Sequence, residues 1–230
     1  MCGRYTSTSS PADLAAYFDV DEVVADDLGD RYNVAPTDEV YAVAQSSSGP
    51  TRLGTFRWGL VPFWAKDPSV GSRMINARAE TLIEKPAFRR PLERFRCIIP
   101  ADGFYEWEAI EGRKKKQPWY IHRTDGDVLS FAGLWSSWRP TKGSDEGRLV
   151  SCTIITTEAN DAVRPVHDRM PVVLPPDAWA DWLDPANDDV DALHSLLVPA
   201  PPELFELVRV NDAVSNVRND GPHLHDPVEA

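Results

Sequence analysis

Short strand-like segments recur through most of the chain. In them, apolar side chains alternate with polar ones or form β-branched and aromatic runs, a composition typical of strands. These segments lie at 39–45, 56–64 (a strand followed by a loop), 96–108, 118–123, 129–138 and 149–157. Asp102 and Gly103 divide the third segment and predict a turn between two strands. The short connections favour antiparallel pairing, because parallel strands need long crossovers.

Helices are expected at both ends of the chain and once in the middle. Ser10 can cap a helix that begins at Pro11, a residue suited to the first helical position, and continues to about Tyr17. The acidic stretch 19–30 is expected to be a loop. Further helices are predicted at 81–95 with interruptions at Pro86 and Pro91, and at 175–183 and 189–197.

The number and order of these segments predict one α+β domain. We expect a curved, barrel-like, mostly antiparallel sheet flanked by helices. A chain of 230 residues with 42% hydrophobic residues and eight Trp can bury a core of that size. The domain is taken as residues 2–220 and the C-terminal tail as 221–230, in which His223 and His225 are expected to be solvated.

Several classes of protein are excluded by missing signals. No run of 18 apolar residues or signal-peptide core occurs, so we expect a cytoplasmic protein without a membrane partner. Cys2, Cys97 and Cys152 are too few and too scattered for a disulfide framework, and no CxxC or zinc-like histidine spacing is present. Nucleotide-binding fingerprints and the GxSxG elbow are absent. We therefore expect a monomer without metal or cofactor.

The charge of the chain gives a mixed indication about nucleic acid. A formal net charge of −12 and a pI of about 4.8 argue against such a partner. The charge is uneven, however, because 88–97 and 112–117 are locally basic, and lysines 114–116 are interpreted as a hairpin tip. An acidic surface with basic patches is consistent with a salt-adapted cytoplasm, in which net charge says less about DNA binding.

Two residues near the start of the chain allow opposite interpretations. Cys2 follows Met1 directly, so removal of Met1 would place a free α-amine and a thiol on adjacent carbons. The alternative is that Cys2 has no role beyond following the translation start. Asn33 lies between Tyr32 and Val34, either as a turn-forming residue or as a buried amide that needs hydrogen-bond partners.

The stretch 74–81 carries polar residues at alternate positions. As a strand it would place Asn76, Arg78 and Glu80 on one face. That face is either solvated or holds an arginine that grips an anion and is oriented by the amide and the carboxylate.

Two further residues are candidates for proton transfer. Glu106 lies between Tyr105 and Trp107, and burial among these rings would favour its neutral form. It could then act as a general acid or base, although Glu108 shares its face and is a rival. His167 is a candidate proton shuttle because histidine titrates near neutral pH, and the alternative is a structural histidine.

Ten motifs in order give the chain a recognisable signature. They are MCGRYT, RYNVAPT, RWGLVPFWAKD, INARAET, FRCIIPADGFYEW, KQPWYIHR, FAGLW, TIITTEAN, HDRMPVVL and VSNVRN. Together they resemble the SOS-response-associated peptidase (SRAP) family, also called abasic-site processing proteins. The resemblance extends from residue 2 to about residue 219 and implies the SRAP fold.

The resemblance implies an activity and a set of residues. Family members bind single-stranded DNA at abasic sites, and their N-terminal cysteine forms a covalent adduct with the sugar aldehyde. The residues that match the catalytic positions are Cys2, Asn33, Glu106 and His167. Those that match DNA-binding positions are Arg4 and Arg78 at phosphates, Asn76 beside them, and Trp64 stacked at the lesion. Phe63 departs from the pattern, because a bacterial relative has a second Trp there.

The implied chemistry explains why an N-terminal cysteine is needed. An amine and a thiol on adjacent carbons can close a five-membered thiazolidine with an aldehyde. Glu106 would supply the acid for dehydration, His167 a proton relay for sugar-ring opening, and Asn33 would orient the amine or a sugar hydroxyl. Weak lyase activity is expected as a side reaction. The protein would act at the nucleoid and replication forks, where fork proteins are expected partners.

A peptidase is the alternative function. In that case Cys2 would be the N-terminal nucleophile that removes the chain's own leader. Only Met1 precedes Cys2 in this sequence, so ordinary removal of methionine explains the same maturation.

Overall fold

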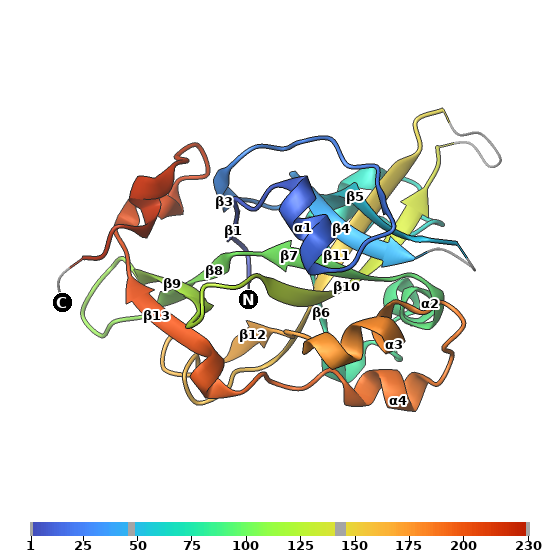
Figure 1. Cartoon of the computed structure of the whole chain (residues 1–230). Coiled ribbons are helices and arrows are strands. Elements are labelled where there is room, and N and C mark those ends of the chain that lie inside the picture. Colours follow the sequence, from blue (N-terminus) through green and yellow to red (C-terminus); the bar gives the residue numbers. More distant parts are fainter. Residues whose placement is uncertain (1, 46–48, 141–145, 229–230) are drawn as a thin grey trace.

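Five strands of the larger sheet close into a barrel (Figure 1). The computed structural model describes residues 2–45, 49–140 and 146–228. Antiparallel ladders join the strands in the order β5–β4–β7–β10–β11, and a parallel pairing of β11 with β5 closes the ring. These strands are β4 (Glu39–Gln45), β5 (Thr51–Trp58), β7 (Arg96–Ala101), β10 (Leu129–Trp138) and β11 (Leu149–Glu158).

Three short strands extend the barrel sheet at its margins. The strand β2 pairs with β5, and both β6 and β12 pair with β11. Their bounds are β2 (Glu22–Val23), β6 (Asn76–Arg78) and β12 (Arg169–Pro171). The acidic stretch 19–30 is thus mostly loop, as predicted, but contains one two-residue strand.

A second sheet of five antiparallel strands lies beside the barrel (Figure 1). Its order is β13–β9–β8–β1–β3, so the N-terminal strand occupies an interior position. The strands are β1 (Tyr5–Ser7), β3 (Arg31–Val34), β8 (Gly103–Glu108), β9 (Gln117–Arg123) and β13 (Phe205–Arg209). Nine of the twelve strand pairings within the described ranges are antiparallel, which confirms the predicted sheet type.

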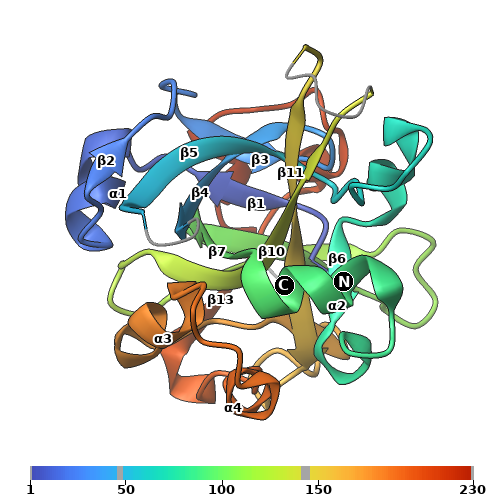
Figure 2. The same cartoon turned by 90° about the vertical axis from the view of Figure 1, so that its right-hand side faces the viewer.

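The barrel strands bury both of their faces. On β4, Val40 and Ala42 belong to the core cluster that extends to the second sheet, whereas Tyr41 and Val43 belong to the cluster under the helices. This follows from the two-residue period of a strand that has packed layers on both sides. The helices are α1 (Pro11–Tyr17), α2 (Pro86–Arg94), α3 (Trp179–Leu183) and α4 (Val190–Ser195). Figure 2 shows α2 in front of the barrel strands β10 and β11.

The helices agree with the predictions to different degrees. Ser10 caps α1 by accepting a hydrogen bond from the Asp13 backbone N–H at 3.2 Å, and Pro11 begins the helix, as predicted. The helix predicted at 81–95 starts only at Pro86, after a 3₁₀ turn at residues 79–81. The interruption predicted at Pro91 is wrong, because α2 continues through this residue to Arg94. The two C-terminal helices are also shorter than predicted.

The turn predicted at Asp102–Gly103 joins strands of different sheets. Neither β7 nor β8 pairs with the other, so a hairpin at this point is wrong. The Asp102 carboxylate instead accepts hydrogen bonds from Thr8 and Ser9, which follow β1. Gly103 is required by packing, since a Cβ there would lie 2.5 Å from the Tyr120 ring.

The segment after β13 packs against the second sheet. His225 stacks on Tyr120 with ring centroids 3.9 Å apart, and its Nε2 lies 3.1 Å from Thr6 Oγ1. Burial lowers the pKa of His225 to about 4. The expectation of solvated histidines is therefore correct for His223, which is exposed, and wrong for His225.

Two further observations concern the whole chain. None of the helices in the described ranges is long and apolar enough to cross a membrane. Cys2, Cys97 and Cys152 are all buried as free thiols.

A close backbone contact at the end of β5 generates a prediction. Gly59 has φ +128°, and a Cβ added to it would lie 2.6 Å from the Gly71 carbonyl oxygen. Gly59→Ala should therefore lower the free energy of unfolding by about 2 kcal/mol or more, measured by urea denaturation.

Gly112→Ala is the matched control. It has φ +78° but no neighbour within 4 Å of the added Cβ, so it should cost only about 1 kcal/mol. Equal losses in the two variants would contradict the steric argument.

Candidate active site

The pairing of β1 with β8 brings the start of the chain to a buried carboxyl group. Tyr5 lies opposite Phe104, and the Tyr105 backbone N–H donates to the Arg4 carbonyl at 3.0 Å. Continuing this antiparallel register places Gly3 opposite Glu106. Cys2 is thereby directed to the surroundings of that side chain.

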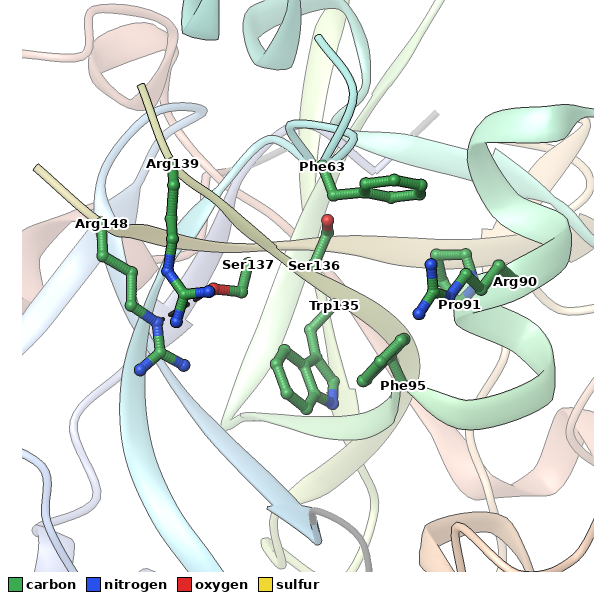
Figure 3. A pocket seen from close by; sticks show the side chains of 9 residues that line it. All are labelled: Phe63, Arg90, Pro91, Phe95, Trp135, Ser136, Ser137, Arg139 and Arg148. Atoms are coloured by element: carbon green, nitrogen blue, oxygen red, sulfur yellow. Dashed lines mark hydrogen bonds between the residues drawn. The ribbon is translucent and has the colours of Figure 1, made fainter. Parts of the chain in front are cut away.

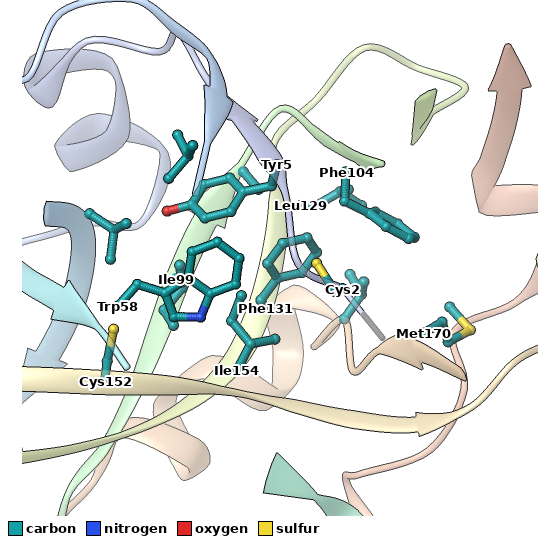
Figure 4. Packing of buried hydrophobic residues seen from close by; sticks show 14 of the residues in the cluster. Cys2, Tyr5, Trp58, Ile99, Phe104, Leu129, Phe131, Cys152, Ile154 and Met170 are labelled. Carbon is teal, nitrogen blue, oxygen red and sulfur yellow. The ribbon is translucent and has the colours of Figure 1, made fainter. Parts of the chain in front are cut away.

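Cys2 is fixed by its backbone and enclosed by apolar residues. The Asn76 Nδ2 donates a hydrogen bond of 2.7 Å to the Cys2 carbonyl. The thiol has no solvent exposure and lies among core residues that include Phe104 and Phe131 (Figure 4). Burial, and secondarily the charge of Glu106, raises the pKa of this thiol far above its usual range. The sulfur is therefore a neutral thiol in this arrangement.

Glu106 is the buried carboxyl of the site. Its side chain is 2% exposed, and burial raises its pKa to about 7. Near neutral pH both of its protonation states are populated. Its rival Glu108 is less buried and accepts a hydrogen bond from Trp119 Nε1 at 2.9 Å, so Glu106 is the inward-facing residue.

His167 lies beside Glu106, with its Nε2 4.0 Å from Glu106 Oε2. Burial lowers the pKa of His167, so the neutral ring predominates at neutral pH. Two groups approach His167 Nδ1, the Arg169 backbone N–H at 3.0 Å and Asp168 Oδ1 at 2.9 Å. Nε2 is the ring nitrogen on the side of Glu106.

Asn33 joins the N-terminal strand to a distant loop. It is 4% exposed, and its Oδ1 accepts a hydrogen bond of 3.1 Å from Arg4 Nη1. Its Nδ2 donates to the carbonyls of Val214, Asn216 and Asn219 at 2.9–3.2 Å. Asn33 is thus a buried amide with hydrogen-bond partners rather than a turn-forming residue. Its catalytic role stays a prediction.

Three of the predicted DNA-binding residues, Phe63, Trp64 and Arg78, are exposed on the surface. The rings of Phe63 and Trp64 are 54% and 57% exposed, which is unusual for aromatic side chains. Trp64 and Asn76 line a common pocket of about 360 Å³, so Trp64 is close to the residue that holds Cys2. Arg78 ends β6 and is exposed.

One expected arrangement is wrong. Asn76 and Glu80 do not orient Arg78, because β6 ends at Arg78 and the following 3₁₀ turn moves Glu80 off that face. Glu80 instead forms a bidentate ion pair of 2.6 and 3.0 Å with Arg169.

Comparison with known proteins identifies the family. The family described as SOS response associated peptidase (SRAP) matches residues 1–217. The chain belongs to the SRAP family. It is 44% identical to the abasic site processing protein YoaM of Bacillus subtilis over 227 residues, covering 98% of each protein. It is 32% identical to the abasic site processing protein YedK of Escherichia coli, covering 99% of this chain and 100% of that one.

A solved structure confirms the SRAP fold. A protein from Bacteroides thetaiotaomicron superimposes with a TM-score of 0.85 at 24% identity and covers 99% of this chain and 100% of its own. Within the described part of the SRAP chain, no group of three or more His, Cys, Asp or Glu side chains could hold a metal ion.

Two residues near the SRAP site were missed by sequence reasoning. Trp107 lies under Arg4, whose guanidinium is 6.0 Å from the ring, and its Nε1 donates to Ser215 at 3.0 Å. Lys116, assigned to a hairpin tip, adds a positive charge that acts on both Glu106 and His167 as a smaller effect than burial. Both contacts depend on the pairing of strands and have no local signal. The sequence showed only that Trp107 is adjacent to Glu106.

The burial of Glu106 predicts a pH dependence of stability. Burial raises the pKa of Glu106 from 4.5 to about 7 in the folded protein, so folding favours the protonated side chain. This contribution to the free energy of unfolding is fully present below about pH 4.5 and is lost as the pH rises through 7. Replacement by glutamine removes this loss. The free energy of unfolding of Glu106→Gln relative to wild type should therefore increase by about 2–3 kcal/mol between about pH 5 and pH 8.5.

Urea denaturation at the two pH values measures this difference. Glu108→Gln is the control, because it removes a less buried carboxylate from the same strand. A parallel pH dependence of wild type and Glu106→Gln would show that the Glu106 pKa is not raised.

Proposed function

We propose that this protein binds single-stranded DNA at abasic sites and forms a thiazolidine crosslink through Cys2. One observation carries the proposal: Cys2 is anchored by Asn76 beside a buried carboxyl, Glu106, whose pKa is about 7. The names of the related abasic site processing proteins support the choice of lesion.

The reaction requires that Cys2 be the first residue of the chain. Its α-amine, with an ordinary pKa of about 7.7–8.0, is partly neutral in the cell and attacks the open-chain sugar aldehyde. The resulting carbinolamine loses water to give an imine. The Cys2 sulfur then adds to the imine carbon, and its proton passes to the nitrogen. The five-membered ring closes through nitrogen, two cysteine carbons, sulfur and the former aldehyde carbon.

The neighbouring groups supply the proton transfers. Protonated Glu106 donates a proton to the departing hydroxyl of the carbinolamine, a step that its pKa near 7 allows at neutral pH. His167 relays a proton during opening of the sugar ring. Since the Cys2 thiol is neutral, the amine reacts first and the sulfur second.

DNA would lie over the exposed aromatic and cationic side chains. Trp64 and Phe63 offer stacking surfaces for bases beside the lesion, a contact that tolerates any sequence. Arg78 offers a charge for a phosphate. Arg4 would meet a phosphate while Asn33 and Trp107 hold its guanidinium in place.

Peptidase activity is the weaker candidate. A cysteine peptidase needs a reactive thiolate, which requires a lowered pKa. Burial does the opposite at Cys2 and raises the pKa of the thiol. Hydrolysis of peptides that depends on Cys2 would favour this alternative.

A denaturing gel tests the proposed crosslink. Protein with Cys2 as its first residue, incubated with single-stranded DNA that contains one abasic site, should give a heat-stable shifted band. Cys2→Ser should lose that band, because the hydroxyl cannot close the thiazolidine. Cys152→Ser is the control for loss of a buried thiol and should retain it. Absence of a band with the wild-type protein would refute the proposal.

The pH dependence of the reaction gives a second test. Crosslinking needs a neutral amine and a protonated Glu106, so its single-turnover rate should be highest between about pH 7 and 8. Glu106→Gln should react about a hundredfold more slowly, with a rate that only rises with pH. A bell-shaped profile that persists in Glu106→Gln would exclude Glu106 as the acid.

A further inference from the structure

A second pocket, away from Cys2, combines aromatic walls with arginines. It has a volume of about 290 Å³ and lies between α2, the end of β10 and the start of the β11 region. The side chains that define it are Phe63, Phe95, Trp135, Arg90, Arg139 and Arg148. No acidic residue is among the described residues that line it, although the chain has a net charge of −12.

The aromatic rings lie between two cationic ends (Figure 3). Phe95 and Trp135 meet edge to face with ring centroids 4.9 Å apart. At one end, the Arg90 guanidinium lies 4.9 Å from the Phe63 ring centroid and 5.8 Å from that of Phe95. At the other end are Arg139 and Arg148, and Arg148 Nε donates to Ser137 Oγ at 2.9 Å.

This distribution of charge selects a ligand with an apolar centre and two anionic ends. A nucleotide within a strand has that form, because its base lies between a 5′ and a 3′ phosphate. Arginine suits the phosphates, and aromatic faces suit a base of any sequence. A free phosphate would leave the rings without a function, and a mononucleotide would use only one cationic end.

Two consecutive residues link this pocket to the surroundings of Cys2. Phe63 lines this pocket, and its neighbour Trp64 lines the pocket that contains Asn76. Asn76 in turn holds the Cys2 carbonyl. A strand with its abasic sugar at Cys2 would therefore pass Trp64 and Phe63 before it reaches the pocket.

We propose that this pocket holds one intact nucleotide of the single-stranded DNA, at a fixed number of nucleotides from the abasic site. The base lies against Phe95 and Trp135, and its two phosphates are bound by Arg90 and by Arg139 with Arg148. The inference rests on the proposed function, since it places the lesion of the same strand at Cys2.

Binding to DNA without a lesion tests the pocket separately from the covalent chemistry. Fluorescence anisotropy with a long oligothymidylate over a series of salt concentrations gives the affinity and the number of neutralised phosphates. Arg90→Ala/Arg148→Ala should weaken binding about tenfold and reduce the salt slope by about 1.4, which is 0.7 per lost phosphate contact. Phe95→Leu should weaken binding without changing the slope, because it removes stacking alone.

Arg89→Ala/Arg94→Ala is the matched control. It also removes two positive charges, but from the exposed side of α2 outside the pocket. Its affinity for the oligothymidylate should stay within about twofold of wild type. A thermal melt of each variant confirms that it is folded. An effect of the pocket variant no larger than that of the control would overturn the proposal. An unchanged affinity in folded Phe95→Leu would overturn the placement of the base.

A photocrosslinking scan locates the base directly. 5-Iododeoxyuridine is placed at each position beside the abasic site in turn, and the adduct is mapped by peptide sequencing. One position should react with Phe95 or Trp135, and its yield should fall in Arg90→Ala/Arg148→Ala. Reaction at neither residue from any position would overturn the proposal. A missing covalent band at Cys2 with normal binding of the oligothymidylate would instead refute the proposed function alone.

Discussion

The antiparallel pairing of β1 with β8 is the interaction on which the site depends. It places Tyr5 opposite Phe104, and the Tyr105 backbone N–H donates to the Arg4 carbonyl, which directs the first residues of the chain toward Glu106. The same pairing places Arg4 over Trp107, the residue next to Glu106. Cys2, Arg4 and Glu106 are thus positioned by one short ladder of backbone hydrogen bonds. The barrel supplies the wall against which this ladder packs.

Burial at this ladder acts in the same direction on two neighbouring groups. It raises the pKa of the Cys2 thiol far above its usual range and brings the pKa of Glu106 to about 7. The thiol therefore stays protonated near neutral pH, whereas the carboxyl is half-protonated there and can both give and take a proton. The desolvated carboxylate lowers the stability of the fold above neutral pH.

Much of the fold was predictable because its signals are local. Alternation identified β4, and Ser10 with Pro11 identified the start of α1. The closure of the barrel by β11 and β5, and the separation of β7 from β8, could not be predicted, because they are pairings between distant segments without a local signal. Of the polar residues that looked out of place in the sequence, Glu106 and His167 do lie side by side, whereas Asn33 and Glu80 take their partners from other elements. Asn33 is the plainest case, with its amide bound to a loop some 180 residues away.

The contacts of Asn33 and Arg4 also set an order in time. Both side chains bind the Val214 carbonyl, which lies 210 residues after Arg4. A ribosome must therefore add almost the whole described chain before the first residues obtain these partners. Until then Arg4 and Asn33 lack the contacts that fix their side chains. The surroundings of the first strand are therefore completed only after the last strand, β13, has been made.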